Sequence, residues 1–342
     1  MTRFDRLFRP TEVALRLQSI TAEAPMANTP TCPLLTLTLN PAVDMTYEVA
    51  QLVRDQKSHA NAVRHDAGGN GVNIGRALRI LGAEATNACV LAGDIGELFE
   101  RLARPQLDHL DIEWVEGESR VNVTVLERAS GAQYQINAVG PVLHDDQLNA
   151  LATRFVSAIG GGIGVLTGSV PPGVGPDIYG ELASRIRGAG GRAVVDTFGA
   201  LLQYAIHAAP FLIKPNRYEL EQFCGRALPA LSDVATQARI LQRGGIEYVC
   251  VSLGAEGALL CGPDNCWHAR APRVVINSSV GAGDSMVAGL VYALAQERTP
   301  LEALRLGIAC GTGTTQHPGT GLFTRDDVDR LLEGIDVTTL DI

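Results

Sequence analysis

The sequence predicts an α/β fold with a doubly wound, mostly parallel sheet and a small β-sheet lid. From residue 34 onward, short aliphatic or β-branched runs alternate with longer amphipathic stretches, which is the pattern of βαβ units. Two regions interrupt this alternation with short segments of period two. The 342 residues, 46% of them hydrophobic, are enough for a large core in one domain or two small ones, and the 37 glycines fit a globular enzyme.

The elements of the sheet follow in chain order. The predicted strands are runs of aliphatic and β-branched residues, at 34–39, 86–91, 164–167, 193–196, 211–214, 248–252 and 258–261. The predicted helices, several of them opened by Asp, Ser or Gly as a cap, are 71–81, 177–187, 233–243 and 284–296. Together they predict helices on both sides of the sheet and a ligand site at its open edge.

The lid is predicted from two segments, at about residues 45–66 and 112–138. In the second segment, residues 121–126 and 133–137 alternate apolar and polar side chains, and Ala129-Ser130-Gly131 joins them. This pattern is typical of antiparallel hairpins. We expect the two insertions to form a small sheet over the ligand-binding edge of the main sheet.

Charge and cysteine content exclude several classes of protein. The net charge of -9 repels a phosphate backbone, so we expect no nucleic acid partner, and no run of about 18 apolar residues predicts a membrane span. The seven scattered cysteines do not form a disulfide framework, which favours a cytoplasmic protein. Cys261 and Cys266 bracket a turn-like Gly-Pro-Asp-Asn, and we interpret them as flanking a hairpin turn rather than as zinc or redox ligands.

The first 33 residues differ in composition from the rest, with four arginines among Leu and Phe before a Thr/Ala/Pro stretch. A targeting peptide would be rich in Arg, but three acidic residues argue against it and no apolar segment of a secretory signal follows. The other interpretation is a disordered extension, or a start of translation at Met26. We therefore assign residues 1–33 to an N-terminal extension and 34–335 to the folded domain.

The sharpest chemical signal is Ser279-Val-Gly-Ala-Gly-Asp-Ser285, directly before an apolar helix. Small residues let the backbone approach an anion, and a helix N-terminus directs free N–H groups at it. Asp284 alone would be an ordinary N-cap, but the glycines beside it favour a catalytic role. In phosphoryl transfer it would accept the proton of the attacking hydroxyl, while the amides of Gly281 to Asp284 hold the transferring charge. Phosphate charge nearby would raise the pKa of Asp284 above its ordinary value of about 3.9.

The sequence contains neither a P-loop nor a complete G-x-G-x-x-G, and the absence of the second disfavours a nicotinamide dehydrogenase. Three further motifs carry polar groups. Residues 67–73 (AGGNGVN) offer glycines and two amides suited to sugar hydroxyls, although a plain turn looks similar. Residues 39–44 (LNPAVD) predict a strand and a Pro-initiated turn that leaves Asp44 at the edge of the sheet. Residues 214–219 (KPNRYE) bring a cation, an amide and a carboxylate together for phosphate and magnesium, or form a helix cap.

Taken in their order along the chain, five motifs resemble the ribokinase-like, or PfkB, family of carbohydrate kinases: residues 40–44, 68–73, 214–219, 252–254 and 281–284. The likeness runs from about residue 34 to 332. The chain is most similar to the phosphofructokinase branch, through residues 39–44, 119–122 (SRVN) and 167–173 (TGSVPPG). The resemblance implies a three-layer α/β/α sandwich with a β lid that pairs between two subunits in a homodimer. It also implies ATP with Mg²⁺ as donor and a sugar phosphate as acceptor.

The resemblance gives a role to each matching residue. Asp284 resembles the family's base, and its anion hole matches Gly281, Ala282 and Gly283. The sugar phosphate would be held by Asp44, Lys57, Gly69, Asn73, Arg120 and Ser169, with Lys57 and Arg120 on the phosphate. The nucleotide would be held by Lys214, Asn216, Ser252, Gly254, Gly257, Val280 and Thr312. Glu219 resembles an indirect Mg²⁺ ligand, and a K⁺ ion is implied near Ser278 and Val280.

Two departures from the family pattern bear on the substrate. Asn70 stands where fructose 1-phosphate kinases are expected to carry Lys, which favours a 6-phosphofructokinase of the minor, non-P-loop type. His59 stands where relatives often carry Arg, which predicts weaker or pH-dependent phosphate binding. We therefore expect phosphorylation of fructose 6-phosphate to the 1,6-bisphosphate. The alternatives are a 1-phosphofructokinase, a tagatose-6-phosphate kinase, a kinase of an unphosphorylated sugar or nucleoside, and a non-catalytic sensor.

Overall fold

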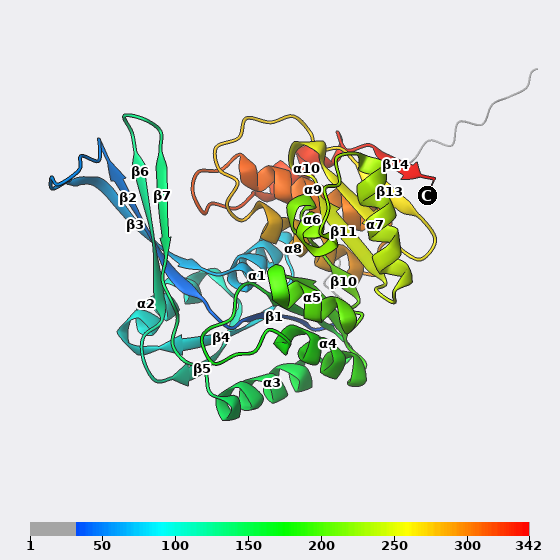
Figure 1. Ribbon diagram of the computed structural model, residues 1–342, viewed down its shortest axis with the longest axis horizontal. Helices are drawn as coiled ribbons and strands as arrows, with labels where there is room; N and C mark the ends of the chain where they lie inside the picture. The colour runs from blue at the N-terminus through cyan, green and yellow to red at the C-terminus, as the bar shows by residue number, and fades with distance from the viewer. Residues whose placement is uncertain (1–31, 342) are drawn as a thin grey trace, which may run out of the picture.

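The computed structural model describes residues 32–341, so the predicted extension lies almost entirely outside the described residues. Its central sheet has ten strands in the order β14-β13-β12-β11-β10-β9-β8-β1-β4-β5 (Figure 1). The strands are β1 (Leu34–Thr38), β4 (Thr86–Ala92), β5 (His109–Val115), β8 (Ile163–Thr167), β9 (Arg192–Asp196), β10 (Leu212–Ile213), β11 (Tyr248–Ser252), β12 (Ala258–Cys261), β13 (Cys266–Ala269) and β14 (Val337–Leu340). Pairing is parallel from β5 to β11 and antiparallel from β11 to β14.

Helices cover both faces of this sheet, because side chains alternate between the faces along each strand. One face packs on α3 (Asp145–Ile159), α4 (Ile178–Gly188), α5 (Gly199–His207), α6 (Arg217–Cys224) and α7 (Leu231–Arg243). The other packs on α1 (Asn70–Leu81), α8 (Ala282–Ala295), α9 (Pro300–Thr315) and α10 (Arg325–Leu332). The predicted α/β/α sandwich is therefore confirmed. Within residues 32–341 no helix combines the length and the apolar character needed to cross a bilayer.

Several elements differ from the prediction. The predicted strand 211–214 shortens to β10, because Pro215 follows Lys214 and has no N–H to donate. The pattern did not reveal α9, because its three glycines obscure a helical period; two of them, Gly307 and Gly311, allow close contact with α8. The sheet also continues through β14, beyond the predicted boundary at residue 335. The remaining elements outside the lid are α2 (Gly93–Ala103) and two short 3-10 helices, Arg104–Gln106 and Gly254–Glu256.

The lid is a separate four-stranded sheet in the order β3-β2-β6-β7 (Figure 1). Its strands are β2 (Ala42–Val49), β3 (Ala60–Gly68), β6 (Arg120–Glu127) and β7 (Gln133–Asn137), and the two predicted hairpins pair with each other through a parallel β2–β6 contact. The predicted segment 112–138 began too early, because residues 112–115 extend β5 along β4 in the central sheet. The predicted turn after Pro41 is also corrected: a lid strand starts at Ala42, and Asp44 lies within it.

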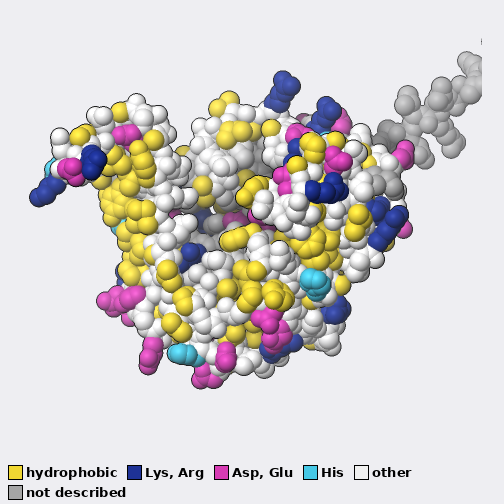
Figure 2. Space-filling view, in the orientation of Figure 1, with side chains coloured by type: hydrophobic (Ala, Val, Ile, Leu, Met, Phe, Trp, Pro, Cys, Tyr) yellow, Lys and Arg dark blue, Asp and Glu magenta, His cyan; other side chains and the backbone are white. Residues whose placement is uncertain are grey.

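The two faces of the lid differ in chemistry because neighbouring residues point to opposite sides. Asp44, Asp66 and Asn122 share a polar face through the pairing of β2 with β3 and β6. The opposite face is apolar, and its base packs against α2 (Gly93–Ala103). Farther out, Val63, Tyr134 and Ile136 are 50%, 48% and 66% exposed, and Figure 2 shows hydrophobic side chains gathered on the lid.

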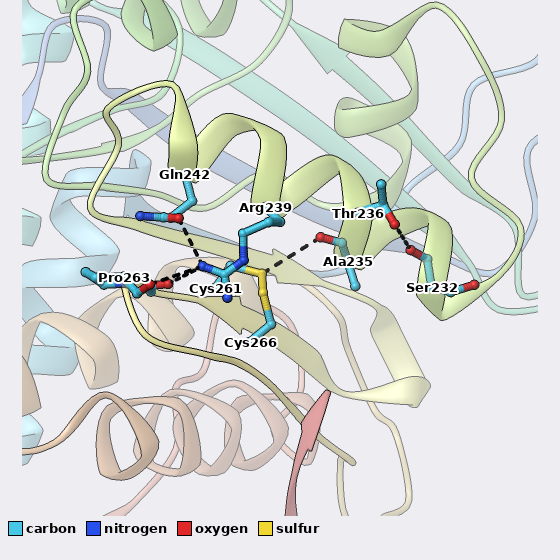
Figure 3. The surroundings of a disulfide bond; sticks show 9 residues. Ser232, Ala235, Thr236, Arg239, Gln242, Cys261, Pro263 and Cys266 are labelled. Atoms are coloured by element: carbon cyan, nitrogen blue, oxygen red, sulfur yellow. Dashed lines mark hydrogen bonds between the residues drawn. A yellow bond between two sulfur atoms is a disulfide. The ribbon is translucent and has the colours of Figure 1, made fainter. Parts of the chain in front are cut away.

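The predicted hairpin turn between Cys261 and Cys266 is confirmed, since it joins β12 to β13. The two cysteines are also bonded as a disulfide (Figure 3), which the sequence analysis did not predict. The turn brings their Cα atoms to 4.1 Å, within bonding reach, although only the pairing of the strands reveals this. Arg239 on α7 donates to the carbonyl oxygen of Gly262 at 2.6 Å and anchors the turn.

Candidate active site

The predicted base sits where α8 begins. Gly281, with φ of 77°, is the N-cap, and the helix starts at Ala282, so Asp284 is not a capping residue. Its Oδ1 accepts a hydrogen bond from Nδ2 of Asn70 at 2.9 Å, and its Oδ2 accepts one from Nδ2 of Asn73, also at 2.9 Å. The side chain is therefore fixed at the meeting point of α8 and α1.

The environment of Asp284 tunes its basicity. Burial, which leaves the residue 5% exposed, raises its pKa to about 6, and the charge of Asp196 adds to the rise. The hydrogen bonds from Asn73 and Asn70 and the charge of Lys214 work in the opposite direction. The rise does not require a bound phosphate, as the sequence-based prediction assumed, because burial in the protein is its largest cause. A carboxylate with this pKa is mostly ionised at neutral pH and still basic enough to accept a proton.

The amides of the predicted anion hole open α8. Gly283 and Asp284 occupy the second and third helical positions, where a backbone N–H has no acceptor within the helix. The helix dipole adds positive potential at this end. A Cβ atom at Gly283 would lie 3.5 Å from Nζ of Lys214, so a fixed ammonium group stands beside these amides. This end of α8 is therefore suited to an anion.

Lys214 is held by a residue that the sequence analysis missed. Its Nζ lies 3.1 Å from Oδ1 of Asp196 at the end of β9, and both side chains are nearly buried. Burial by itself would lower the pKa of Lys214, but the carboxylate of Asp196 outweighs it and keeps the pKa above its ordinary value. The only available signal was an acidic residue at the carboxyl end of a predicted strand.

Asn216 and Glu219 form the capping box of α6. Oδ1 of Asn216 accepts from the backbone N–H of Glu219, and Oε2 of Glu219 accepts from that of Asn216, each at 2.8 Å. The helix-cap interpretation of residues 214–219 therefore holds. Burial raises the pKa of Glu219 while Lys214 opposes the rise. Asp196 and Glu219 both lie close enough to Lys214 to raise its pKa, and carboxylate oxygens are ligands that Mg²⁺ prefers. Among residues 32–341, no cluster of three His, Cys, Asp or Glu side chains is placed to hold a metal ion, so these two carboxylates would need oxygen ligands from elsewhere.

Several residues predicted to hold the sugar phosphate lie on the lid strands or beside them. Oδ1 of Asp44 accepts from Nδ2 of Asn122 at 2.9 Å, and burial raises the pKa of Asp44 while Arg120 opposes the rise. Nε of Arg120 donates to the carbonyl oxygen of Asn40 at 3.0 Å, and Nδ2 of Asn40 reaches Oγ of Ser169 at 3.3 Å. A cation, a carboxylate and a hydroxyl are thus brought together.

Gly69 and Lys57, which were also predicted to hold the sugar phosphate, lie outside this group of contacts. Gly69, with φ of 130°, forms the turn between β3 and α1, and a Cβ atom there would lie 2.8 Å from Cγ2 of Thr38. Its role is to let the backbone turn closely. Lys57 lies in the exposed connection between β2 and β3. Figure 1 shows this connection at the outer end of the lid, away from α8. The described part of the chain shows no hydrogen bond or ion pair between Lys57 and the other predicted residues.

A cavity of about 510 Å³ adjoins the start of α8, which is a volume typical of a small-molecule site. The predicted nucleotide residues Ser252, Gly254, Gly257 and Thr312 line it, together with Ala282 and Gly283. Lys214, Asn216 and Val280, which were also predicted to hold the nucleotide, are not in its lining. Much of the wall comes from residues 271–274, Ile276, Met286, Ile308 and Gly311, which were not predicted because apolar walls carry no recognisable motif.

The residues implied for K⁺ lie in one loop beside this cavity. Oγ of Ser278 donates to the carbonyl oxygen of Gly319 at 2.8 Å and accepts from the backbone N–H of Val280 at 3.2 Å. The hydroxyl is therefore engaged within the loop. Backbone carbonyl oxygens would have to supply the ligands of an ion here.

The cavity is lined by Gly283, directly before the buried carboxylate of Asp284, and Asn70 and Asn73 of α1, the helix that follows lid strand β3, bind that carboxylate. This fold and site are those of a carbohydrate kinase. The chain belongs to the pfkB family carbohydrate kinases, whose family model matches residues 34–327. It is accordingly a phosphotransferase with an alcohol group as acceptor.

Named relatives support this assignment. The chain is 37% identical to the 1-phosphofructokinase of Xanthomonas campestris pv. campestris over 275 residues, which are 78% of this chain and 86% of that relative. It is 34% identical to the ATP-dependent 6-phosphofructokinase isozyme 2 of Escherichia coli K12 over 302 residues, which are 87% and 97% of the two chains. Phosphofructokinase-2 from E. coli, solved in complex with substrates and products, superposes with a TM-score of 0.84 at 32% identity, covering 88% of this chain and 99% of that chain.

Proposed function

We propose that this protein transfers the γ-phosphoryl group of ATP to a hydroxyl of a fructose phosphate, with fructose 6-phosphate as the first candidate. The observation that carries the proposal is the position of Asp284. It faces two amides of α1, opens the helix that lines the nucleotide cavity, and has a pKa suited to a base. The site thus offers proton removal and charge stabilisation within one helical turn.

In the proposed reaction Asp284 accepts the proton of the attacking hydroxyl, and the amides of Gly283 and Asp284 with Lys214 stabilise the transferring phosphoryl charge. Glu219 and Asp196 would hold Mg²⁺, directly or through water. The ion, when bound, supplies neutralising charge to the phosphates of ATP. The loop of Ser278 and Val280 is a candidate K⁺ site, and a solved structure of E. coli phosphofructokinase-2 is described as a complex with potassium.

Fructose 1-phosphate is the second candidate acceptor, because most of the named relatives are 1-phosphofructokinases. Asn70 in place of Lys favours fructose 6-phosphate. An assay of ADP release with fructose 6-phosphate, fructose 1-phosphate, tagatose 6-phosphate and ribose tests the choice. The acceptor with the highest kcat/KM identifies the substrate, and failure of all four would contradict the proposed function.

Arg120 is expected to bind the phosphate of the acceptor. Replacing it by Ala should raise KM for fructose 6-phosphate about 10- to 100-fold, because a charge-assisted hydrogen bond is lost. KM for ATP should stay unchanged, since Arg120 lies on the lid. Steady-state kinetics measure both constants. Arg128→Ala, which removes a lid arginine paired with Glu48 on the exposed surface, is the matched control. An unchanged KM in Arg120→Ala would favour a kinase of an unphosphorylated sugar or nucleoside.

The proposed assembly is a homodimer through the apolar face of the lid. This face exposes Val63, Tyr134 and Ile136, and a second copy would cover them. Lys57 at the lid tip would then act on the partner's substrate, which accounts for its distance from the site of its own chain. One solved structure of E. coli phosphofructokinase-2 is described as a tetrameric inhibited form, so larger assemblies occur in that relative.

Ile136→Asp is expected to weaken this dimer by at least about tenfold in Kd, because the interface would bury an unpaired charge. Sedimentation across a concentration series measures the shift. Ile240→Asp provides the control, since Ile240 is 54% exposed on α7, far along the chain from the lid strands. An Ile136→Asp protein with the mass of the wild type at every concentration would refute the proposed interface.

A further inference from the structure

We propose that Asn70 is a positioning residue that, together with Asn73, holds the carboxylate of Asp284 in the orientation in which the acceptor hydroxyl reaches it. The inference rests on the proposed function and adds a residue that acts through the base. Both amides come from the first turns of α1 and each binds a different oxygen of the same carboxylate. Two donors on two oxygens fix both the position and the rotation of the group.

The two asparagines are fixed in different ways. Oδ1 of Asn73 accepts from Nη1 of Arg76 at 3.3 Å, so the NH₂ group of Asn73 must face Asp284. Asn70 is the first residue of α1, directly after the Gly69 turn. The backbone of Gly168, whose φ is 83°, lies close to the Asn70 side chain: a Cβ atom added at Gly168 would be 3.2 Å from Oδ1 of Asn70. The Asn70 amide therefore has little room to move on that side. The backbone on both sides of Asn70 therefore places it against the base.

The hydrogen bonds from Asn70 and Asn73 leave Asp284 able to accept a proton. An ionised carboxylate has about four acceptor sites on its two oxygens, so two hydrogen bonds from amides leave sites for the acceptor hydroxyl. Asn70 is exposed whereas Asp284 is buried, so one of the two amides that bind the carboxylate belongs to a residue in contact with solvent. Its N–H group also favours the charged form of Asp284 and lowers its pKa, in opposition to burial.

A charge series at position 70 tests the inference through the acidic limb of the kcat/KM profile against pH, which reports the pKa of the base. Asn70→Ala removes the hydrogen-bond donor and should raise the pKa of this limb by about one unit. Asn70→Asp adds a like charge and should raise it by about two units. Asn70→Lys adds a cation and should move it down. The expected order of the limb pKa is Asp, Ala, Asn, Lys, from highest to lowest. Asn149→Asp makes the same change at an exposed position of α3 and should leave the limb in place.

If Asn70 had a purely structural role, all variants would have a lower kcat but the same pKa for the acidic limb. The same limb pKa in all variants would overturn the inference and leave the proposed kinase function intact. A second measurement does not need turnover. The melting temperature of each position-70 variant is measured between pH 4 and 9, with and without the additional substitution Asp284→Asn. The pH at the midpoint of the change in this temperature difference reports the titration of Asp284. The same order of midpoints supports the inference even if no sugar phosphate is turned over, whereas equal midpoints contradict it.

Discussion

Asp284→Asn is expected to lower kcat by about 10²- to 10⁴-fold, which is the usual contribution of a general base. The variant keeps the shape of the side chain and removes its ability to accept a proton. ATP binding should persist, because the cavity is lined by other residues and the Gly283 amide is unchanged. Stopped-flow or steady-state ADP release measures the loss, and calorimetry with ATP measures the retained binding. Turnover at the wild-type rate would refute the role of Asp284 as base.

The same substitution should stabilise the fold at neutral pH. The pKa of Asp284 is about 6 in the folded protein and 3.8 for the free residue, so between these values the folded state binds more protons. The free energy of unfolding therefore falls as pH rises through this window, and the loss persists above it. Asp284→Asn avoids the loss and should be more stable at pH 7.5 by up to about 3 kcal/mol, if the Asn70 amide turns to accept a hydrogen bond. Melting curves at pH 4 and 7.5 test this, since the gain should vanish at the lower pH.

Lys214→Met is expected to destabilise the protein by about 3 to 5 kcal/mol, because it leaves the nearly buried carboxylate of Asp196 without its partner. It should also slow phosphoryl transfer, because the ammonium group beside Gly283 is lost. Denaturant unfolding and steady-state kinetics measure the two effects separately.

A double variant separates the two roles of this lysine. Lys214→Met with Asp196→Asn carries no unpaired charge and should recover most of the stability, yet it should not recover kcat. Arg54→Met is the control, because the Arg54–Asp55 pair is 93% and 88% exposed and such pairs contribute less than about 1 kcal/mol. A Lys214→Met protein as stable as the wild type would show that the ion pair contributes little.

The sequence pattern was most informative where a structural feature can be formed by only a few residue types. Alternating strands and helices predicted the sandwich, and the glycines before Asp284 predicted a helix start that binds an anion. Local pattern was less informative for the lid, where residues 112–115 have the period of a lid strand but extend β5. The disulfide between Cys261 and Cys266 was missed for the same reason, since a spacing does not show which side chains face each other across a hairpin.

The sequence by itself determined the alternation of strands and helices and the glycine-framed helix start that carries the proposed base, because periodicity and backbone freedom are local properties of a chain. Only the tertiary structure decided which groups tune that base. The amides of Asn70 and Asn73 are 214 and 211 residues from Asp284 along the chain, and Asp196 reaches Lys214 from a neighbouring strand. Burial and charge at a site depend on such distant segments packing together, and it is this packing that raises the pKa of Asp284.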